Sequence, residues 1–430
     1  MNANQMQGFG LNMLSRLAQS EWPERLGLRK SVEKLLYAGT RTGFQLAGAA
    51  ARQFGGGKLD RKQRLPAPAK GVFDLSLSAE QQMLRDTLQR FARDVLRPAA
   101  AGADQDAAFP AALRAQALEL GLNFYAVPEA LGGMAAEQAV VTNVLMAEDL
   151  GYGDFTLGAA LLSPMGVANA LTRWGTQAQQ EKYLPAFAKE NPPPATFAVA
   201  EAVPAFNPNE LATRATRDGN AYVLNGEKAL VLLARDAELF LVAAALEGRP
   251  AVFIVEGGSS GLGFREDPAM GLKAAETLKM RLENVRAEKL GEADFDYAAC
   301  LDLGALMWCA LAVGTCQAVM DYAIRYANER VAFGEPISHR QSVAFMIADM
   351  AIEIDAMRLL VWNAAALAEA GKPFHREAYL ARLLTAEKSM RIGSDGVQIL
   401  GGHGFTREHP VERWYRDLRA VAVMHSGLHA

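Results

Sequence analysis

The sequence has few cysteines and lacks the short loops that bind nucleotides in many enzymes. Its 430 residues hold three cysteines, Cys300, Cys309 and Cys316, and none belongs to a CxxC pair. Cys309 and Cys316 lie seven residues apart and so share one face of a helix. We expect buried, reduced thiols in a cytoplasmic protein. Neither GxGxxG after a strand nor GxxxxGK[ST] occurs, which excludes the two common phosphate-binding loops.

Long hydrophobic runs are missing as well. Half of the residues are hydrophobic, but no stretch reaches the roughly 18 to 20 apolar residues that a membrane span needs. The first ten residues have no basic region followed by an apolar run, so a secretory signal is not expected. With 21% charged residues, the composition is that of an ordinary globular protein with enough apolar material for large cores.

The net charge of −4 is unevenly distributed along the chain. Residues 1–70 hold 12 Lys or Arg and 4 Asp or Glu, a balance of +8, whereas the remaining residues hold 32 and 44, a balance of −12. Nucleic-acid binding requires a basic surface on the folded body, so the acidic body argues against a nucleic-acid partner. The basic segment 1–72 is predicted to be an N-terminal extension and linker.

Within this extension, residues 30–54 combine basic side chains with apolar residues near helical spacing, a pattern typical of a basic amphipathic helix. A stretch rich in Gly, Pro and basic residues at 54–71 separates this helix from the rest of the chain. Two interpretations stay open. We favour a strap that packs on the body over an interfacial segment that makes peripheral contact with a membrane.

From residue 73 onward the hydrophobic pattern changes its period twice. Residues 73–190 show helical spacing, and residues 191–297 show short apolar or alternating runs bounded by turn residues. Residues 298–430 are helical again, in four long segments that indicate a four-helix bundle. Because helices and strands are segregated along the chain, the predicted fold class is α+β, without an alternating parallel sheet.

Local signals add detail to this division. Ser78 and Gln81 have the spacing of a helix-capping box, and Pro98 is predicted to end the helix that begins there. The stretch "DGNAYVLNGEK", which begins at Asp218, is predicted to contain two hairpin turns because it holds Asp-Gly and Asn-Gly pairs.

The stretch "YANERVAFGEPISHRQ", which begins at Tyr326, places three ligand-binding side-chain types around one turn. Arg330 ends a helix, Phe333 lies in the turn, and Gln341 lies early in the next helix. A guanidinium, an aromatic face and an amide suit the pyrophosphate and adenine of a flavin. Taken alone, the same residues also fit a helix connection with a surface arginine.

A second pattern, "QILGGHGF", begins at Gln398 near the end of another helix. Gly401 and Gly402 permit close approach of the backbone to a ligand, although glycine at a helix C-terminus is commonly only a cap. Two such features in one helical domain favour a binding site for an anionic ligand.

These stretches, together with "LSAEQQMLRDTLQRFARDVLRP", "YAVPEALGG", "YVLNGEK" and "HPVERWYRDLR", resemble the acyl-CoA dehydrogenase family over residues 73–427. The resemblance implies a helical N-terminal domain, a middle β-barrel or sandwich domain and a C-terminal four-helix bundle. It also implies FAD as cofactor and an acyl-CoA thioester as substrate, oxidised between Cα and Cβ. A glutamate takes the α-proton, hydride passes to flavin N5, and an electron-transfer flavoprotein reoxidises the flavin.

Both positions that carry the catalytic glutamate in the family lack a carboxylate here. The first falls on His425, or on Ser426 if one residue is inserted, and the second falls on Gly304 with Ala305 in place of a following arginine. His425 is a candidate for an unusual base because histidine titrates near neutrality, but we prefer to interpret it as a frayed terminal residue. His425 and His429 are four residues apart, yet no third ligand is evident and no metal site is expected.

The flavin-binding loop of the middle domain departs from the family pattern too. In "AEAVPAFN", Ala200 lacks a hydroxyl, Val203 and Ala205 replace glycines, and Phe206 replaces a small serine. Residues 230–232, "LVL", replace the aromatic-x-Thr that lies against the flavin ring in the family. A buried flavin edge without its hydrogen-bond donors costs roughly 1–3 kcal/mol per lost partner.

In the family, one subunit holds the isoalloxazine end of the flavin and a neighbour holds the adenine end. This chain keeps the residues that serve a neighbour and has altered those that serve itself, so the hypothesis is a degenerate subunit that completes a homologous partner's FAD site. Two alternatives stay open: a self-sufficient, homo-oligomeric dehydrogenase with an unusual base, and a non-catalytic acyl-CoA-binding or membrane-associated scaffold. The residues assigned to the neighbour's flavin are Arg330, Phe333, Gln341, Gln398, Gly401 and Gly402.

Overall fold

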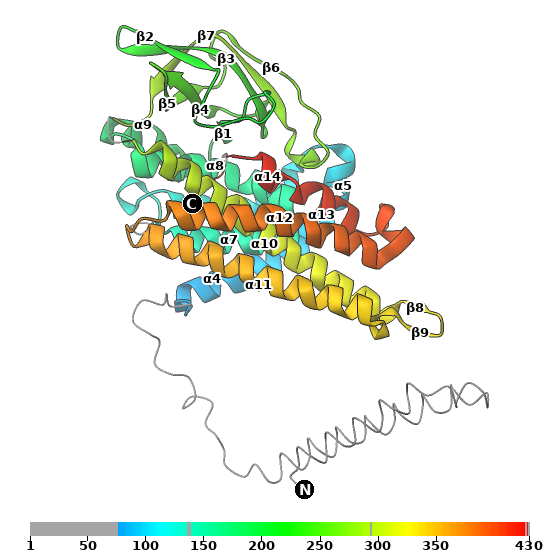
Figure 1. Cartoon of the computed structure of the whole chain (residues 1–430). Helices are drawn as coiled ribbons and strands as arrows, with labels where there is room; N and C mark the ends of the chain where they lie inside the picture. The colour runs from blue at the N-terminus through cyan, green and yellow to red at the C-terminus, as the bar shows by residue number, and fades with distance from the viewer. Residues whose placement is uncertain (1–75, 136–138, 293–294, 426–427, 429–430) are drawn as a thin grey trace, which may run out of the picture. The chain divides into compact units, whose positions relative to one another are not determined.

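The computed structural model describes residues 76–135, 139–292, 295–425 and 428. In these residues a helical part, a β part and a second helical part follow one another along the chain, which confirms the predicted architecture (Figure 1). The predicted extension 1–72, with its amphipathic stretch 30–54, lies outside the described residues.

The N-terminal helical part begins with the predicted capping box. The Ser78 hydroxyl accepts a hydrogen bond from the Gln81 backbone N–H, and the Gln81 side chain accepts one from the Ser78 backbone N–H. The α-helices of this part are α4 (Ala79–Phe91), α5 (Arg97–Asp106), α6 (Ala111–Glu119), α7 (Val140–Gly153), α8 (Phe155–Trp174) and α9 (Gln177–Phe187). Short 3-10 turns, η3 (Leu122–Ala126) and η4 (Glu129–Leu131), lie between α6 and α7.

The prediction that Pro98 ends the first helix is wrong. A π-helical turn, η2 (Ala92–Leu96), follows α4 directly, and the chain continues into α5 with Pro98 in its first turn. The Arg97 backbone N–H donates to the Ala92 carbonyl, five residues earlier, as in a π-helix. This wider turn accommodates the backbone N–H that Pro98 lacks. Proline is tolerated in the first turn of a helix because N–H groups there have no intrahelical partner.

The β part is a barrel with two extra strands. Strands β4, β2, β3, β7 and β5 pair in that order, and β5 pairs back with β4 to close the ring. β1 adds in parallel to β4, and β6 pairs with β7. The strands are β1 (Ala195–Ala198), β2 (Arg214–Asp218), β3 (Ala221–Val231), β4 (Leu239–Leu246), β5 (Arg249–Glu256), β6 (Leu262–Glu266) and β7 (Leu278–Lys289).

Only one of the two predicted hairpin turns forms. The turn at Gly219 joins β2 to β3, but β3 runs on through the Asn-Gly pair, where its register with β7 shifts between Leu224 and Gly226. Gly226 has φ 150°, and a Cβ on it would lie 2.7 Å from the Thr213 Cα. The glycine therefore serves a β-bulge and a close backbone approach, a role that sequence alone does not separate from a turn.

The C-terminal part consists of three long helices and a shorter final segment. The long helices are α10 (Tyr297–Glu329), α11 (Gln341–Glu369) and α12 (His375–Leu400), and a small hairpin, β8 (Val331–Ala332) with β9 (Glu335–Pro336), precedes the turn η6 (Ile337–His339) and α11. The fourth predicted segment is broken into the turn η7 (Gly401–Phe405), α13 (Val411–Leu418) and α14 (Ala420–Val423). α10 packs against α7, α11 and α12, and its cysteines Cys300, Cys309 and Cys316 are buried free thiols, as predicted.

Two helices are more apolar than the sequence pattern indicated. Among the described residues, α8 and α10 are long and apolar enough to cross a membrane by length and composition. Within the apolar window of each helix, 78% and 83% of the residues are buried inside the protein. Most apolar side chains of these two helices are buried within the protein, so both are core helices of the folded body.

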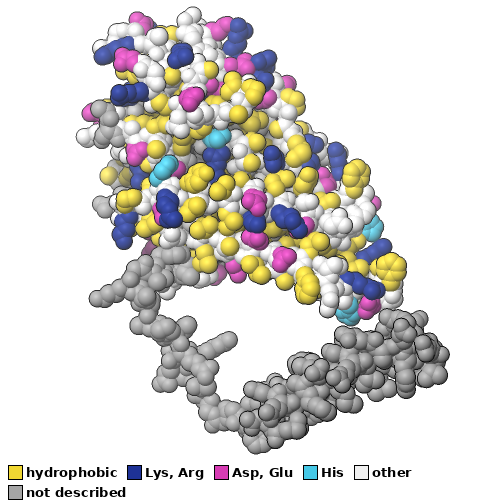
Figure 2. Space-filling view, in the orientation of Figure 1, with side chains coloured by type: hydrophobic (Ala, Val, Ile, Leu, Met, Phe, Trp, Pro, Cys, Tyr) yellow, Lys and Arg dark blue, Asp and Glu magenta, His cyan; other side chains and the backbone are white. Residues whose placement is uncertain are grey.

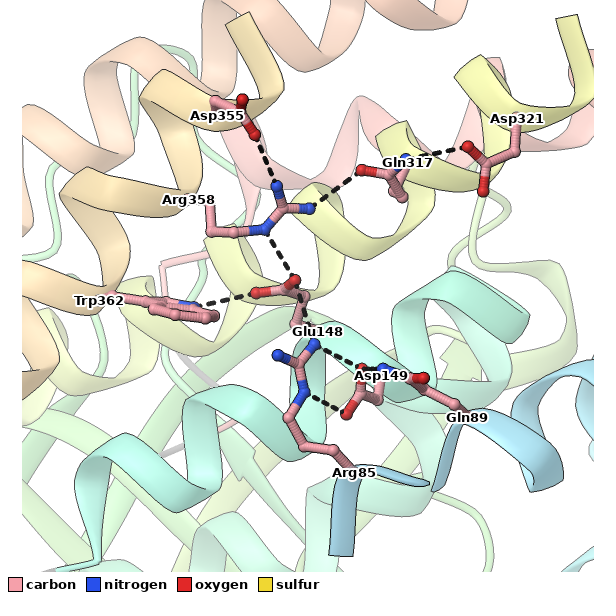
Figure 3. Close-up of polar contacts among 9 residues, drawn as sticks. All are labelled: Arg85, Gln89, Glu148, Asp149, Gln317, Asp321, Asp355, Arg358 and Trp362. Carbon is pink, nitrogen blue, oxygen red and sulfur yellow. Dashed lines mark hydrogen bonds and ion pairs between the residues drawn. The ribbon is translucent and has the colours of Figure 1, made fainter. Parts of the chain in front are cut away.

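A buried carboxylate connects four of the helices (Figure 3). Glu148 of α7 accepts hydrogen bonds from Arg358 Nε at 2.9 Å and from Trp362 Nε1 at 3.0 Å, both on α11. Arg85 of α4 lies 3.5 Å from the same carboxylate. Arg358 also donates to the Gln317 side chain of α10 at 3.1 Å, so one polar cluster joins α4, α7, α10 and α11.

One residue of the loop between β1 and β2 has a strained backbone conformation. Ala205 has φ 53°, in the left-handed region that favours glycine. Nearby, the Glu201 carboxylate accepts hydrogen bonds from the backbone N–H groups of Ala212 at 2.7 Å and Thr213 at 2.9 Å. These bonds fix the loop from both sides, so the loop keeps a glycine-like backbone where no glycine is present.

Replacing Arg358 by leucine should lower the free energy of unfolding by about 3 kcal/mol, because Glu148 would lose its closest cationic partner in a buried position. Urea unfolding measures the change. The matched control is Arg376→Leu, which removes an exposed arginine paired only with Glu377 and should change stability by less than about 0.5 kcal/mol. Equal effects of the two variants would contradict a structural role for the cluster.

The variant Ala205→Gly should raise the free energy of unfolding by about 0.5 kcal/mol, because relief of the left-handed conformation exceeds the entropy cost of glycine. Val203→Gly in the same loop is the control. Val203 has no positive φ, so this change should only destabilise. Thermal and urea unfolding of both variants test the point, and a loss of stability in Ala205→Gly would show that the strain is not present.

Candidate active site

The end of the C-terminal bundle contains a cavity of about 330 Å³ that brings the two glycine and arginine patterns together. Arg330 follows α10, Gly401 and Gly402 follow α12, and all three line the cavity. Gly401 has φ 57°, and a Cβ added at either glycine meets no atom within 4 Å. At Gly402 no neighbouring protein atom would clash with a side chain. The space beside this glycine is therefore open to a ligand in the cavity.

The other three predicted residues lie outside the lining of this cavity. Phe333 is 96% exposed in the β8–β9 turn, with the Arg340 guanidinium 5.8 Å from its ring centre. Gln341 begins α11, and Gln398 lies in the last turn of α12, both exposed. These groups are free for a partner, whereas the described chain itself gathers only Arg330 and the glycines.

Sequence reasoning missed a tyrosine and histidine cluster beside the cavity. Tyr326 lines the cavity, and its hydroxyl lies 2.8 Å from His403 Nδ1. One turn earlier, the Tyr322 hydroxyl lies 2.7 Å from His409 Nδ1. The spacing of the two tyrosines, four residues apart on α10, was the available signal. The pairs fix the turn η7 against α10 and so hold the glycines in place.

His425, at the first base position, is a well-anchored residue, and its interpretation as frayed is wrong. Arg382 of α12 lies 2.9 Å from His425 Nδ1 and 3.3 Å from the Met424 carbonyl oxygen. Arginine has no acceptor, so Nδ1 accepts this hydrogen bond and the neutral ring carries its proton on Nε2. Burial, with the Arg382 charge beside it, lowers the pKa of His425 to about 4.

The two altered stretches of the chain meet at this point. The Phe206 ring packs edge-on against the His425 ring, with 5.4 Å between centroids and 80° between planes. Phe206 comes from the loop after β1, and His425 comes from the residues after α14. The residues predicted to stand in place of the family's serine and glutamate are therefore in contact.

The second predicted base position has no acceptor side chain. Gly304 and Ala305 are buried within α10. The nearest carboxylate along α10 is Asp302, which lies 2.6 Å from His375 Nδ1 in an ion pair. Burial raises the pKa of Asp302, and the carboxylate in turn raises the pKa of His375. Ser426, the alternative first position, lies outside the described residues.

On the β-barrel side, the two positions predicted to correspond to hydroxyl residues of the family are Ala200 and Leu232. Ala200 and Leu232 are both buried. The loop is held instead by a buried ion pair, in which Lys228 Nζ lies 2.8 Å from Glu201 and donates to the Val199 carbonyl at 3.1 Å. Burial lowers the pKa of Lys228 to about 8 although Glu201 acts against it. The barrel side is thus intact as a scaffold but lacks side-chain donors at these two positions.

Comparison with known proteins places the chain in a family. Three family models match consecutive parts of the chain: the acyl-CoA dehydrogenase N-terminal domain at residues 78–191, the middle domain at 196–285 and the C-terminal domain at 297–425. All three described parts are therefore represented, in the order in which they occur in the chain.

Characterised relatives match over the same region. The mitochondrial short-chain specific acyl-CoA dehydrogenase of Bos taurus is 33% identical over 367 residues, covering 81% of this chain and 87% of its own length. The acryloyl-CoA reductase (NADH) of Anaerotignum propionicum is 31% identical over 365 residues, covering 81% and 92%. The structure of butyryl-CoA dehydrogenase from Megasphaera elsdenii superposes with a TM-score of 0.76 at 28% identity, covering 82% and 96%. This chain belongs to the acyl-CoA dehydrogenase family, whose members are FAD flavoproteins that oxidise acyl-CoA thioesters.

Proposed function

We propose that this chain is a degenerate acyl-CoA dehydrogenase subunit that completes the FAD site of a homologous, active partner. The observation that carries the proposal is the state of His425, at the first of the family's two base positions. Its Nδ1 accepts a hydrogen bond from Arg382, and its ring packs against the Phe206 ring. The second position, at Gly304, has no acceptor side chain at all.

This arrangement opposes proton abstraction. A general base needs a free lone pair and a pKa near the working pH. Here the available lone pair is engaged by a permanent cation, and the pKa of about 4 makes the ring a weak acceptor at neutrality. The proton on Nε2 makes that nitrogen a hydrogen-bond donor, whereas the family's reaction needs an acceptor. General base catalysis typically contributes about 100-fold to 10,000-fold, so its loss removes most of the rate.

The two flavin half-sites differ in how well they fit the cofactor. At the bundle end, Arg330 and the open backbone at Gly401 and Gly402 suit a pyrophosphate, and the exposed Phe333 ring suits an adenine. On the barrel side, Leu232 and Ala200 offer no hydroxyl to the isoalloxazine edge. When bound, FAD supplies the hydride acceptor of the family's reaction. The chain is thus equipped to hold the distal end of a flavin whose reactive ring belongs to another subunit.

An exposed apolar face on the bundle supports a subunit partner. Phe345, Ile352 and Leu359 recur every seven residues along α11 and are 62%, 67% and 45% exposed. Tyr379 and Leu383 of α12 are exposed as well, and Figure 2 shows apolar side chains gathered over this face. A seven-residue apolar repeat on a helix surface is the pattern that packs against another helix. We expect the homologous subunit to cover it.

The second candidate function is a self-sufficient, homo-oligomeric dehydrogenase served by an electron-transfer flavoprotein. The relatives favour it, because the Bos taurus protein is named a dehydrogenase and matches across all three parts of the chain. The deciding experiment is the flavin content and acyl-CoA oxidation of the chain purified alone, and again with a homologue encoded nearby. One tightly held flavin per chain and ordinary turnover by the chain alone would overturn the degenerate-subunit proposal.

The titration of His425 gives an independent test of the base argument. Because its folded-state pKa lies below the ordinary value of 6.5, His425 contributes stability above pH 6.5 that is lost as the pH falls through about 4. His425→Phe should therefore reduce the loss of unfolding free energy on acidification by roughly 1 kcal/mol per pH unit in that window. Urea unfolding between pH 7 and 4.5 measures it.

His375→Gln is the control with the opposite sign. The ion pair with Asp302 raises the pKa of His375, so this residue contributes stability below pH 6.5 that is lost as the pH rises through its folded-state pKa. Its removal should lessen the loss of stability toward alkaline pH and leave the acid side unchanged. An acid profile that is identical in wild type and His425→Phe would show that the ring is protonated normally.

Arg330→Ala should reduce flavin retention in the complex with the partner at least tenfold while this chain stays folded, because a charged hydrogen bond to phosphate contributes about 1.5–3 kcal/mol. Arg325→Ala, one turn earlier on α10 and outside the cavity lining, is the matched control. Absorbance at the flavin band after gel filtration reports retention. Retention that drops equally in both variants, or in neither, would contradict a specific contact from Arg330.

A further inference from the structure

A second cavity lies away from both half-sites. It has a volume of about 70 Å³ and is enclosed by α6, the turn η3, α8 and the start of β1. None of its lining residues belongs to the base region around His425 or to the bundle-end cavity. The cavity also touches Leu233, directly after the "LVL" stretch that replaces the family's flavin-flanking residues.

Short and rigid side chains keep this space open. Ala117, Ala160 and Ala195 contribute single methyl groups from three elements, and they cannot reach across the gap. Pro164 lies inside α8 and has no backbone N–H, so the Ala160 carbonyl lacks its usual helical donor at the cavity wall. Since α8 is buried on its other faces, the surrounding core holds the helix in place and the gap is not closed by collapse.

One charged group borders the cavity. Arg114 of α6 is half-buried and lines the wall, with its guanidinium 5.6 Å from the Phe109 ring centre. Among the described residues no carboxylate pairs with it, in contrast to the half-buried Arg85, Arg358 and Arg416. An apolar cavity with one unpaired guanidinium at its wall matches a ligand that has a short hydrocarbon tail and an anionic head.

We propose that this cavity binds a short aliphatic carboxylate, with the chain between the alanines and the carboxylate on Arg114. The volume of about 70 Å³ is roughly half of the 150 Å³ that accommodates benzene, which fits a chain of about three or four carbons. A CoA thioester has no carboxylate at its acyl carbon and does not satisfy Arg114, so the ligand is the free acid. This site is separate from the flavin half-site and does not depend on the proposed subunit role.

The test is isothermal titration of the full chain with butyrate, with butanol and butyryl-CoA as comparison ligands. Butyrate is expected to bind with a dissociation constant of about 1 mM, and butanol at least tenfold more weakly because it lacks the charge. Arg114→Gln should weaken butyrate binding about tenfold and leave butanol binding unchanged. Arg217→Gln, an exposed arginine on β2, is the control and should change neither.

A second variant tests whether butyrate binds in this cavity, independently of any folding defect in the arginine variant. Leu118→Trp adds volume at a half-buried position of the cavity wall and should abolish binding of both small ligands while circular dichroism and thermal unfolding stay as in wild type. Butyrate binding that survives Leu118→Trp or Arg114→Gln, or that is absent in the wild type, overturns the proposal. Displacement of butyrate by butyryl-CoA overturns it as well, because the cavity would then be the acyl pocket of the thioester substrate.

Discussion

The Glu148 carboxylate is the constraint on which the helical body depends. It lies between an arginine of α4 and an arginine and a tryptophan of α11, and through Arg358 it is linked to α10. An ion of this kind is stable in the interior only with all its partners in place, so the relative positions of these helices are fixed as a set. The cluster anchors α10, which has Gly304 near its start and is followed directly by Arg330. It therefore helps to position both candidate sites.

The Arg382 guanidinium limits the basicity of any group at position 425. Arg382 faces His425 from a partly buried position. A carboxylate at position 425 would pair with that guanidinium, and the ion pair would hold its pKa low. The arginine therefore opposes a strong base whichever side chain stands opposite, and Phe206 adds a steric cover from the barrel side.

The architecture could be predicted from the sequence because periodicity and caps are local properties. The Ser78 box formed as expected, and the change from helix to strand and back was visible in the spacing of apolar residues. Contacts between distant stretches could not be predicted. Segments far apart in the sequence meet where Arg382 donates to His425 and Phe206 packs on the same ring. The Asn-Gly pair at Gly226 is compatible with either a turn or a bulge, and the sequence alone does not separate the two. The site residues of the bundle end were predicted as motifs, but only Arg330 and the two glycines share one cavity.

The length of α10 separates the two candidate sites along the bundle. From Gly304 to Arg330 the helix axis spans about 40 Å at its regular rise. Gly304, at a predicted base position, and Arg330, at the bundle-end cavity, therefore lie at opposite ends of one long helix. Gly304 does not line the cavity at Arg330, so a substitution at Gly304 leaves that lining unchanged. In the proposed subunit role, changes near Gly304 can therefore accumulate while the bundle-end cavity at Arg330 is kept.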